Sequence, residues 1–102
     1  MAITVLNSEN YDSSIKRGMV FVEFSSPMCG PCKLMEHNLE QLHDRLHGII
    51  KIFKVDVEAE PELAKRFKIL SVPTTLAYNE GMHQGTAVGV TSPSRLLDIL
   101  GV

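Results

Sequence analysis

The sequence has no tryptophan and only two cysteines among its 102 residues. Two cysteines are too few for the disulfide framework that stabilises small secreted proteins. Apolar runs are all much shorter than about 18 residues, so we expect no transmembrane helix. Basic residues are not in excess, because 10 Lys and Arg stand against 12 Asp and Glu, for a formal net charge of -2. This balance argues against a nucleic-acid-binding surface.

The composition is typical of one soluble folded domain. Apolar residues make up 44% of the chain and charged residues 22%, close to the average of globular proteins. The length fits a single domain, which we expect to span residues 1–102. The segment from Met1 to Leu6 carries no basic residue, unlike the start of a secretory signal peptide. We therefore expect a cytoplasmic protein that binds neither membrane nor nucleic acid.

Apolar runs separated by capping and turn residues predict alternating strands and helices. Strands are expected at 3–6, 19–24, 49–57, 74–78 and 82–88. Helices are expected from Asn7 or Ser8 to about Lys16, from the cysteines to Gly48, from Pro61 through Phe67, and after Ser92. A hairpin turn is expected at 79–81. This order predicts an α/β domain with helices on both faces of a mixed sheet.

The helix that follows the cysteines has the clearest pattern. Its apolar stripe recurs at spacings of 3, 4, 3 and 4, and consists of Cys32, Met35, Leu39, Leu42 and Leu46. The charged residues off this stripe are expected to face water: Lys33, Glu36, Glu40, Asp44 and Arg45.

The two cysteines form a Cys29-Gly30-Pro31-Cys32 motif, a spacing used for redox exchange or for half of a zinc site. A structural zinc site needs four ligands, and the spare candidates are only His37, His43, His47 and His83. A purely structural disulfide across three residues would restrict the unfolded chain little. Redox exchange is therefore the favoured interpretation, and no metal site is expected.

The motif stands between a buried strand and the start of the long helix. The N–H groups and dipole of a helix N-terminus stabilise a thiolate. We expect Cys29 to be the more accessible sulfur and hence the attacking nucleophile. Cys32 belongs to the apolar stripe and would be the shielded, resolving thiol. Pro31 suits the first turn, where a missing N–H costs little.

Glu23 interrupts the apolar run that leads to the cysteines. Burial of a carboxylate raises its pKa, and such a group could accept the Cys32 proton as that thiol attacks. The alternative is that Glu23 lies near the strand end and reaches water.

Taken together, these residues resemble the thioredoxin family over essentially the whole chain. The resemblance rests on the Cys29–Cys32 motif, on Glu23, on Lys54 before Val55-Asp56-Val57, on Pro61, on Val72-Pro73-Thr74, on the 79–81 turn and on Val88-Gly89-Val90. It implies a thioredoxin fold, with a central mixed five-stranded β-sheet flanked by four helices, and a cis peptide bond at Val72-Pro73.

The resemblance also implies the activity and its partners. The protein would be a monomeric protein-disulfide reductase, without a cofactor of its own, re-reduced by a flavin-dependent thioredoxin reductase. Lys54 would lie near Glu23 and tune its proton affinity. Protein substrates would bind in an extended form across Met28, Gly30, Pro31, Val72, Pro73 and Val90, pairing with the Val72 backbone. The proline between the cysteines and the absence of a signal pattern favour a reductant.

Three positions depart from the family pattern. Met28 replaces the tryptophan usual before the first cysteine, Ser25 stands where a second aromatic is usual, and Glu23 replaces an aspartate. Methionine is apolar and flexible, so it can still form a docking surface. Two other functions stay open: a thioredoxin-fold docking module with incidental redox activity, and a metal or iron–sulfur carrier that bridges two chains through Cys29.

Overall fold

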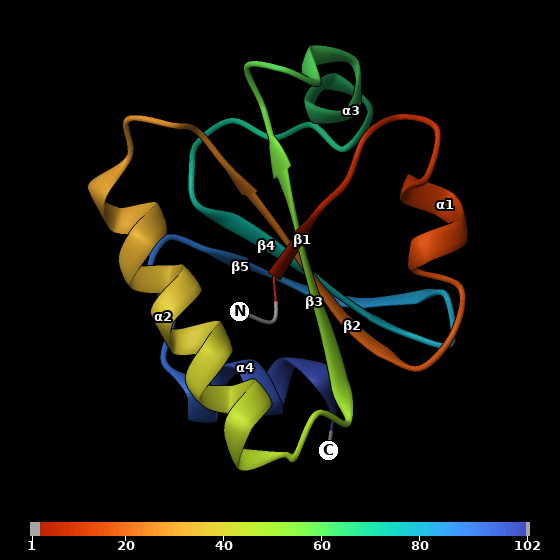
Figure 1. Ribbon diagram of the computed structural model, residues 1–102, viewed down its shortest axis with the longest axis vertical. Coiled ribbons are helices and arrows are strands. Elements are labelled where there is room, and N and C mark those ends of the chain that lie inside the picture. The colour runs from red at the N-terminus through yellow and green to blue at the C-terminus, as the bar shows by residue number, and fades with distance from the viewer. Residues whose placement is uncertain (1–2, 102) are drawn as a thin grey trace.

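The computed structural model describes residues 3–101. Within them, one five-stranded sheet has the order β1-β3-β2-β4-β5. The strands are β1 (Ile3–Val5), β2 (Met19–Ser25), β3 (Ile50–Asp56), β4 (Thr74–Asn79) and β5 (Met82–Val88). The neighbours β1, β3 and β2 are parallel, whereas β4 is antiparallel to both β2 and β5. The predicted mixed sheet is confirmed (Figure 1).

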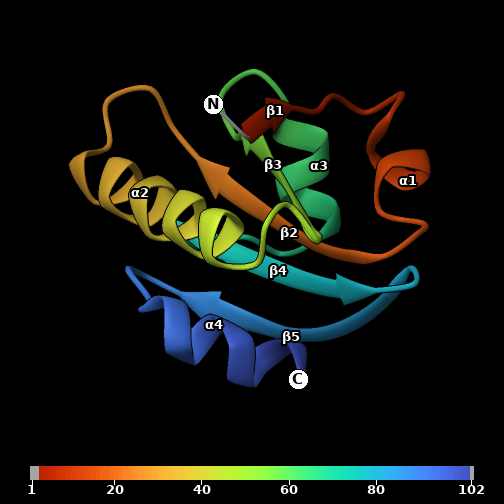
Figure 2. The same ribbon diagram turned by 60° about the horizontal axis from the view of Figure 1, so that its bottom comes forward.

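Helices cover both faces of this sheet (Figures 1 and 2). They are α1 (Tyr11–Ser14), α2 (Gly30–Arg45), α3 (Pro61–Arg66) and α4 (Pro93–Leu100). One core cluster joins the sheet to α1 and α3, and a second joins it to α2 and α4. Among the helices of residues 3–101, none is long and apolar enough to cross a membrane. The five strands and these four helices give the thioredoxin fold that the resemblance implies.

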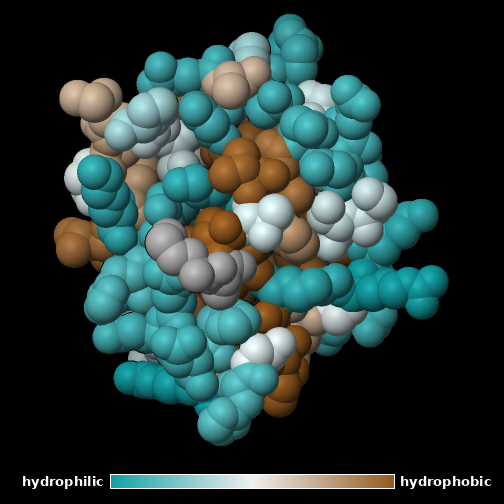
Figure 3. Space-filling model, viewed as in Figure 1, coloured by the Kyte–Doolittle hydropathy of each residue, from teal (hydrophilic) through white to brown (hydrophobic). Residues whose placement is uncertain are grey.

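Strand β2 shows how the pleat divides the core. Successive side chains of a strand point to opposite faces. Val20, Val22 and Phe24 pack in the α1–α3 cluster, and Phe21 packs in the α2–α4 cluster. By this alternation Glu23 lies on the same face as Phe21, beneath α2. Figure 3 shows the outer surface on one side of the molecule, where hydrophilic side chains separate smaller apolar patches.

The long helix α2 buries most of the predicted stripe, but it ends at Arg45, earlier than the predicted end at Gly48. Cys32, Met35, Leu39 and Leu42 are buried, as the spacing indicates. Glu36, however, does not face water as expected, because only 17% of its side chain is exposed and it contacts Lys54. The predicted stripe depends only on the spacing of apolar residues along the helix. It therefore cannot predict that a charged residue of the helix contacts a charged partner on a neighbouring strand.

The first helix is shorter than predicted. It spans Tyr11–Ser14 instead of beginning at Asn7 or Ser8. The Asn7 side-chain oxygen accepts hydrogen bonds from the backbone N–H groups of Glu9 and Asn10. An asparagine that bonds its own neighbouring backbone forms a turn that competes with a helix. Asn7 therefore closes a turn, and the helix itself begins only at Tyr11.

The turn between β4 and β5 and the last helix, α4, lie where the sequence predicts them. Glu80 and Gly81 join β4 to β5 with positive φ angles of 51° and 82°. A Cβ atom on Gly81 would lie 3.3 Å from the Lys16 carbonyl oxygen, so the close approach also favours glycine. Ser92 is the N-cap of α4, where its Oγ accepts the Arg95 N–H at 3.2 Å. Pro93 occupies the first turn, as predicted.

Candidate active site

Figure 1 shows the loop that joins the end of β2 to the start of α2. Cys29 is the last residue before α2, and Cys32 lies in its first turn. They are joined by a disulfide bond, with their Cα atoms 5.3 Å apart. β2 is the central strand and its carboxyl end feeds the helix through a short loop. In open α/β sheets, this end of the strands is where reactive groups are presented.

Cys29 is the N-cap of α2. Its Sγ accepts a hydrogen bond from the backbone N–H of Cys32, at 3.1 Å. Pro31 follows in the first turn and has no N–H to satisfy. A thiolate at this sulfur would be stabilised by the same N–H and by the helix dipole.

The two sulfurs differ in access. Cys29 is 9% exposed and Cys32 is 1% exposed. Cys32 lies among the buried residues of α2, so an incoming group reaches Cys29 first. This asymmetry follows from the apolar stripe, which includes Cys32 and omits Cys29.

Exposed apolar side chains lie directly before the cysteines and on the loop that follows β5. Met28 is 94% exposed and Val90 is 49% exposed. Gly30 and Pro31 are also exposed, and Val72 is half-buried. Pro73 is buried, and the Val72-Pro73 peptide bond is cis, as the resemblance implies.

Hydrogen bonds hold the loop that carries Val90. The Gly89 N–H donates to the Pro73 carbonyl oxygen at 2.8 Å. The Asn38 side-chain amide of α2 donates to the Thr91 carbonyl oxygen at 2.9 Å. The Thr91 N–H in turn donates to the Met35 Sδ at 3.3 Å. Val90 is thus fixed relative to both α2 and Pro73.

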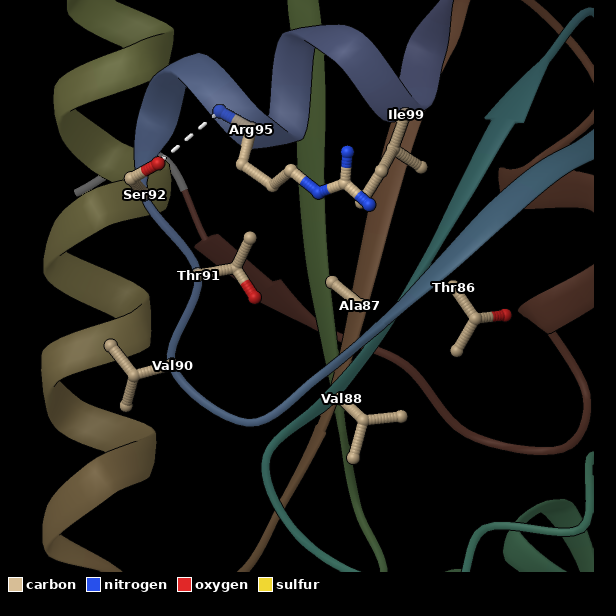
Figure 4. Close-up of a pocket in the computed structure, with 8 residues that line it drawn as sticks. All are labelled: Thr86, Ala87, Val88, Val90, Thr91, Ser92, Arg95 and Ile99. Atoms are coloured by element: carbon tan, nitrogen blue, oxygen red, sulfur yellow. Dashed lines mark hydrogen bonds between the residues drawn. The ribbon is translucent and has the colours of Figure 1, made fainter.

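Beside this loop lies a groove of about 350 Å³ between β5 and α4 (Figure 4). Val90 lines it at the loop end, and the Arg95 side chain extends along the helix side. The full lining is Thr86, Ala87, Val88, Val90, Thr91, Ser92, Arg95 and Ile99. Most of the surface exposed in this groove is polar, so it does not continue the apolar surface at Val90.

Glu23 is fully buried beneath α2, and neither carboxyl oxygen has a hydrogen-bond partner. Its neighbours across the sheet are Lys54 on β3 and Thr75 on β4. The Thr75 hydroxyl is also buried without a partner. Burial first, and then the nearby Glu36 carboxyl, raise the pKa of Glu23 to about 9, while Lys54 acts in the opposite direction. In the disulfide form, the neutral carboxyl is therefore the main species at neutral pH.

Lys54 stands next to Glu23 in the sheet, but its ammonium contacts another carboxylate. The Lys54 Nζ lies 3.4 Å from the Glu36 Oε1. Glu36 follows Cys32 by four residues on α2, so the two share one face of the helix. The structure thus gathers Glu23, Lys54 and Glu36 beneath the first turns of α2.

Glu36 is the residue that sequence reasoning missed at this site. The signal that could have found it is the spacing of four residues from Cys32, together with a lysine in register with Glu23. Among residues 3–101, no group of three or more His, Cys, Asp or Glu side chains is arranged to hold a metal ion.

Comparisons with known proteins agree with this geometry. The family model described as Thioredoxin matches residues 2–101. The thioredoxin of Staphylococcus haemolyticus is 33% identical over 100 residues, covering 98% of this chain and 96% of the relative. A thioredoxin of Staphylococcus aureus is 31% identical over the same length and coverage.

A solved structure shares the fold. Oxidised mitochondrial thioredoxin 3 from Saccharomyces cerevisiae superposes with a TM-score of 0.84 and 28% identity, over 97% of this chain and 93% of that chain. The family-model match, over residues 2–101, spans both cysteines and all of the described strands. With its Cys29–Cys32 disulfide at the head of α2, the chain belongs to the thioredoxin family and is a dithiol–disulfide oxidoreductase.

Proposed function

We propose that this oxidoreductase reduces disulfide bonds of other proteins, with Cys29 as nucleophile and Cys32 as resolving thiol. The observation that carries the proposal is the unequal access of the two sulfurs at the N-terminus of α2. The accessible sulfur is also the one that receives the helix N–H. We infer that residues 1–102 act as one domain, because all described strands join a single sheet.

The reaction begins with the reduced protein. The Cys29 thiolate attacks one sulfur of the substrate disulfide, and the other substrate sulfur leaves as a thiolate that takes a proton from water. The Cys32 thiol then loses its proton and attacks the Cys29 Sγ. This second step forms the Cys29–Cys32 disulfide and releases the second substrate thiolate, so two electrons pass to the substrate.

Glu23 takes the proton that Cys32 releases. Its carboxylate lies beneath α2 with no hydrogen-bond partner, and its raised pKa favours the protonated form once the disulfide exists. Lys54, its neighbour in the sheet, moderates that proton affinity. When the disulfide is reduced again, Glu23 returns the proton to the Cys32 sulfur.

The exposed residues around Cys29 form the docking surface. We propose that an extended substrate segment lies across Met28, Gly30 and Pro31 and continues toward Val90. It would pair with the backbone of Val72 next to Pro73. Because Met28 is apolar and 94% exposed, it can take the docking role of the aromatic residue that it replaces.

The cellular setting follows from the same proposal. A flavin-dependent thioredoxin reductase would return electrons to the disulfide, and the protein would work as a monomer in the cytoplasm. A reducing compartment suits a protein whose product state is the disulfide.

Reduction of insulin by dithiothreitol tests the function. Wild type should accelerate the precipitation of insulin chains far above the dithiothreitol background, and Cys29→Ser should abolish that acceleration. A wild-type rate equal to the background would contradict reduction of protein disulfides and would favour the docking-module alternative.

A further inference from the structure

A row of polar side chains crosses the sheet directly beneath α2. Phe21, Ile52 and Ala77 lie side by side on β2, β3 and β4, and all three pack in the α2–α4 cluster. A second row lies two residues away on each strand, on the same face, and consists of Glu23, Lys54 and Thr75. Their register is direct, with Lys54 and Thr75 each paired to Glu23.

Lys54, the cation of this row, forms its ion pair with a residue outside the row. A lysine directly beside a buried carboxylate would ordinarily form an ion pair with it. Instead, the Lys54 Nζ contacts the Glu36 Oε1 on α2, and both Glu23 oxygens remain without a partner. The Glu36 and Lys54 side chains are 17% and 33% exposed, so the contact lies at the boundary between the core and solvent.

We propose that Glu36 is a positioning residue of the redox centre: its carboxylate holds the Lys54 ammonium and thereby keeps the proton on Glu23 in the disulfide form. The inference rests on the proposed role of Glu23 as the proton partner of Cys32. The proposal gives Glu36, which lies outside the Cys29–Cys32 motif, a role in setting the pH range over which Glu23 keeps this proton.

The charges around Glu23 make this assignment specific. From β3 comes Lys54, from β4 the uncharged Thr75, and from α2 come Glu36 and the disulfide-bonded Cys32. Lys54 lowers the pKa of Glu23, whereas burial and Glu36 raise it. The Glu36 carboxyl raises the pKa of Glu23 directly, first through a side-chain interaction between the two carboxyl groups and then through its charge. It also holds the Lys54 ammonium, which would otherwise be free to pair with Glu23.

The consequence for the reaction concerns re-reduction. A donor thiolate attacks the Cys29 Sγ, the bond between Cys29 and Cys32 breaks, and the Cys32 sulfur leaves as a thiolate. A neutral Glu23 can give its proton to that leaving thiolate and become a carboxylate. The donor's second thiolate then releases Cys29, so the donor ends as a disulfide and this protein as a dithiol. The protonated Glu23 carboxyl is thus the general acid for the first step.

Titration of the Glu23 carboxyl carbon by NMR, in the oxidised protein, tests the proposal without reference to activity. Glu36→Gln frees Lys54, so Glu23 should titrate at a pH lower by roughly 1 unit or more. Glu36→Asp keeps the charge and should restore part of the difference. The matched control is Asp44→Asn on the same helix, whose side chain is 85% exposed; it should leave the titration unchanged. An unchanged titration in Glu36→Gln would overturn the proposal.

The same substitution, made in a Lys54→Gln variant, tests whether Glu36 acts through Lys54. In Lys54→Gln, no ammonium remains to be held, so adding Glu36→Gln should move the titration less than it does in wild type. An equal shift in both backgrounds would contradict the claim that Glu36 acts through Lys54.

The rate at which dithiothreitol opens the disulfide, corrected for the dithiothreitol thiolate, separates this inference from the proposed function. The rate should decline at lower pH in Glu36→Gln than in wild type, and Glu23→Gln should lack that decline. If the NMR titration shifts but the wild-type and Glu23→Gln profiles coincide, the positioning by Glu36 stands and the proton role of Glu23 fails.

Discussion

The backbone N–H of Cys32 donates a hydrogen bond to the Sγ of Cys29, 3.1 Å away, at the first turn of α2. The residue that caps the helix is therefore also one of the two redox sulfurs. Such a bond stabilises negative charge on the acceptor, so it favours the thiolate at Cys29 over the thiolate at Cys32. The backbone of this first turn thus adds a chemical difference to the difference in access between the two cysteines.

This difference predicts selective alkylation. In the reduced protein at neutral pH, iodoacetamide should modify Cys29 at least about tenfold faster than Cys32, because Cys29 has both the thiolate character and the access. Partial alkylation followed by peptide mass mapping measures the two rates. Cys29→Ser serves as the control, since its remaining thiol should react slowly. Equal rates at the two cysteines would contradict the assignment of roles.

The raised pKa of Glu23 predicts a pH-dependent stability. Between its ordinary value of 4.5 and about 9, the folded protein retains a proton that the unfolded chain has lost. The stability contributed by this group is fully present below pH 4.5 and is lost as the pH rises through 9. The free energy of unfolding of wild type should fall relative to Glu23→Gln by up to about 1.4 kcal/mol per pH unit in this window.

Urea denaturation of the two oxidised proteins at several pH values within that window gives the comparison. Glu23→Gln has no carboxyl group to titrate at this position, so the difference between the proteins isolates Glu23. A difference that is constant with pH, or that grows in favour of wild type at high pH, would contradict burial of a neutral carboxyl.

Much of the fold could be predicted because the core residues follow regular periods. The continuous apolar runs of β2 and β3 indicate strands buried on both faces, and the stripe from Cys32 to Leu42 indicates the side of α2 that packs on the sheet. The start of α1 could not be predicted, because Asn7 can close a turn or cap a helix.

Met28 predicts a difference between large and small substrates. Met28→Ala should lower kcat/KM for insulin roughly tenfold, equivalent to about 1.4 kcal/mol of lost docking. It should leave the reaction with a small disulfide reagent nearly unchanged. Met82→Ala is the matched control, since Met82 is 70% exposed at the hairpin end of β5, remote from the cysteines. Equal losses with both substrates would assign Met28 a role in the chemistry instead.

A buried hydroxyl pair between α1 and β4 predicts a stability effect. The Tyr11 and Tyr78 hydroxyls are 2.8 Å apart, and both residues are buried. Tyr11→Phe removes one partner and leaves the other hydroxyl unsatisfied, which should cost about 1–2 kcal/mol in the free energy of unfolding. The double variant with Tyr78→Phe should cost less than the sum of the two single changes. Strict additivity in urea denaturation would show that the two hydroxyls do not interact.

The candidate site was less predictable than the fold. The motif and its position before a helix indicate the sulfurs and their order, because spacing alone places Cys32 on the buried stripe. The partner of Lys54 could not be predicted, since Glu23 and Glu36 are both within reach of a residue on β3. Choosing between them requires the packing of α2 over the sheet, which depends on contacts between segments distant in sequence.

The most direct test of the exchange mechanism is to trap its intermediate. Cys32→Ser should accumulate a mixed disulfide with a substrate protein, because Cys29 can attack but no resolving thiol can release it. Non-reducing electrophoresis and mass spectrometry would show one covalent partner attached through Cys29, removable by dithiothreitol. If the substrate is found attached through Cys32 in Cys29→Ser, and no adduct forms on Cys29 in Cys32→Ser, the assigned roles of the two sulfurs are wrong.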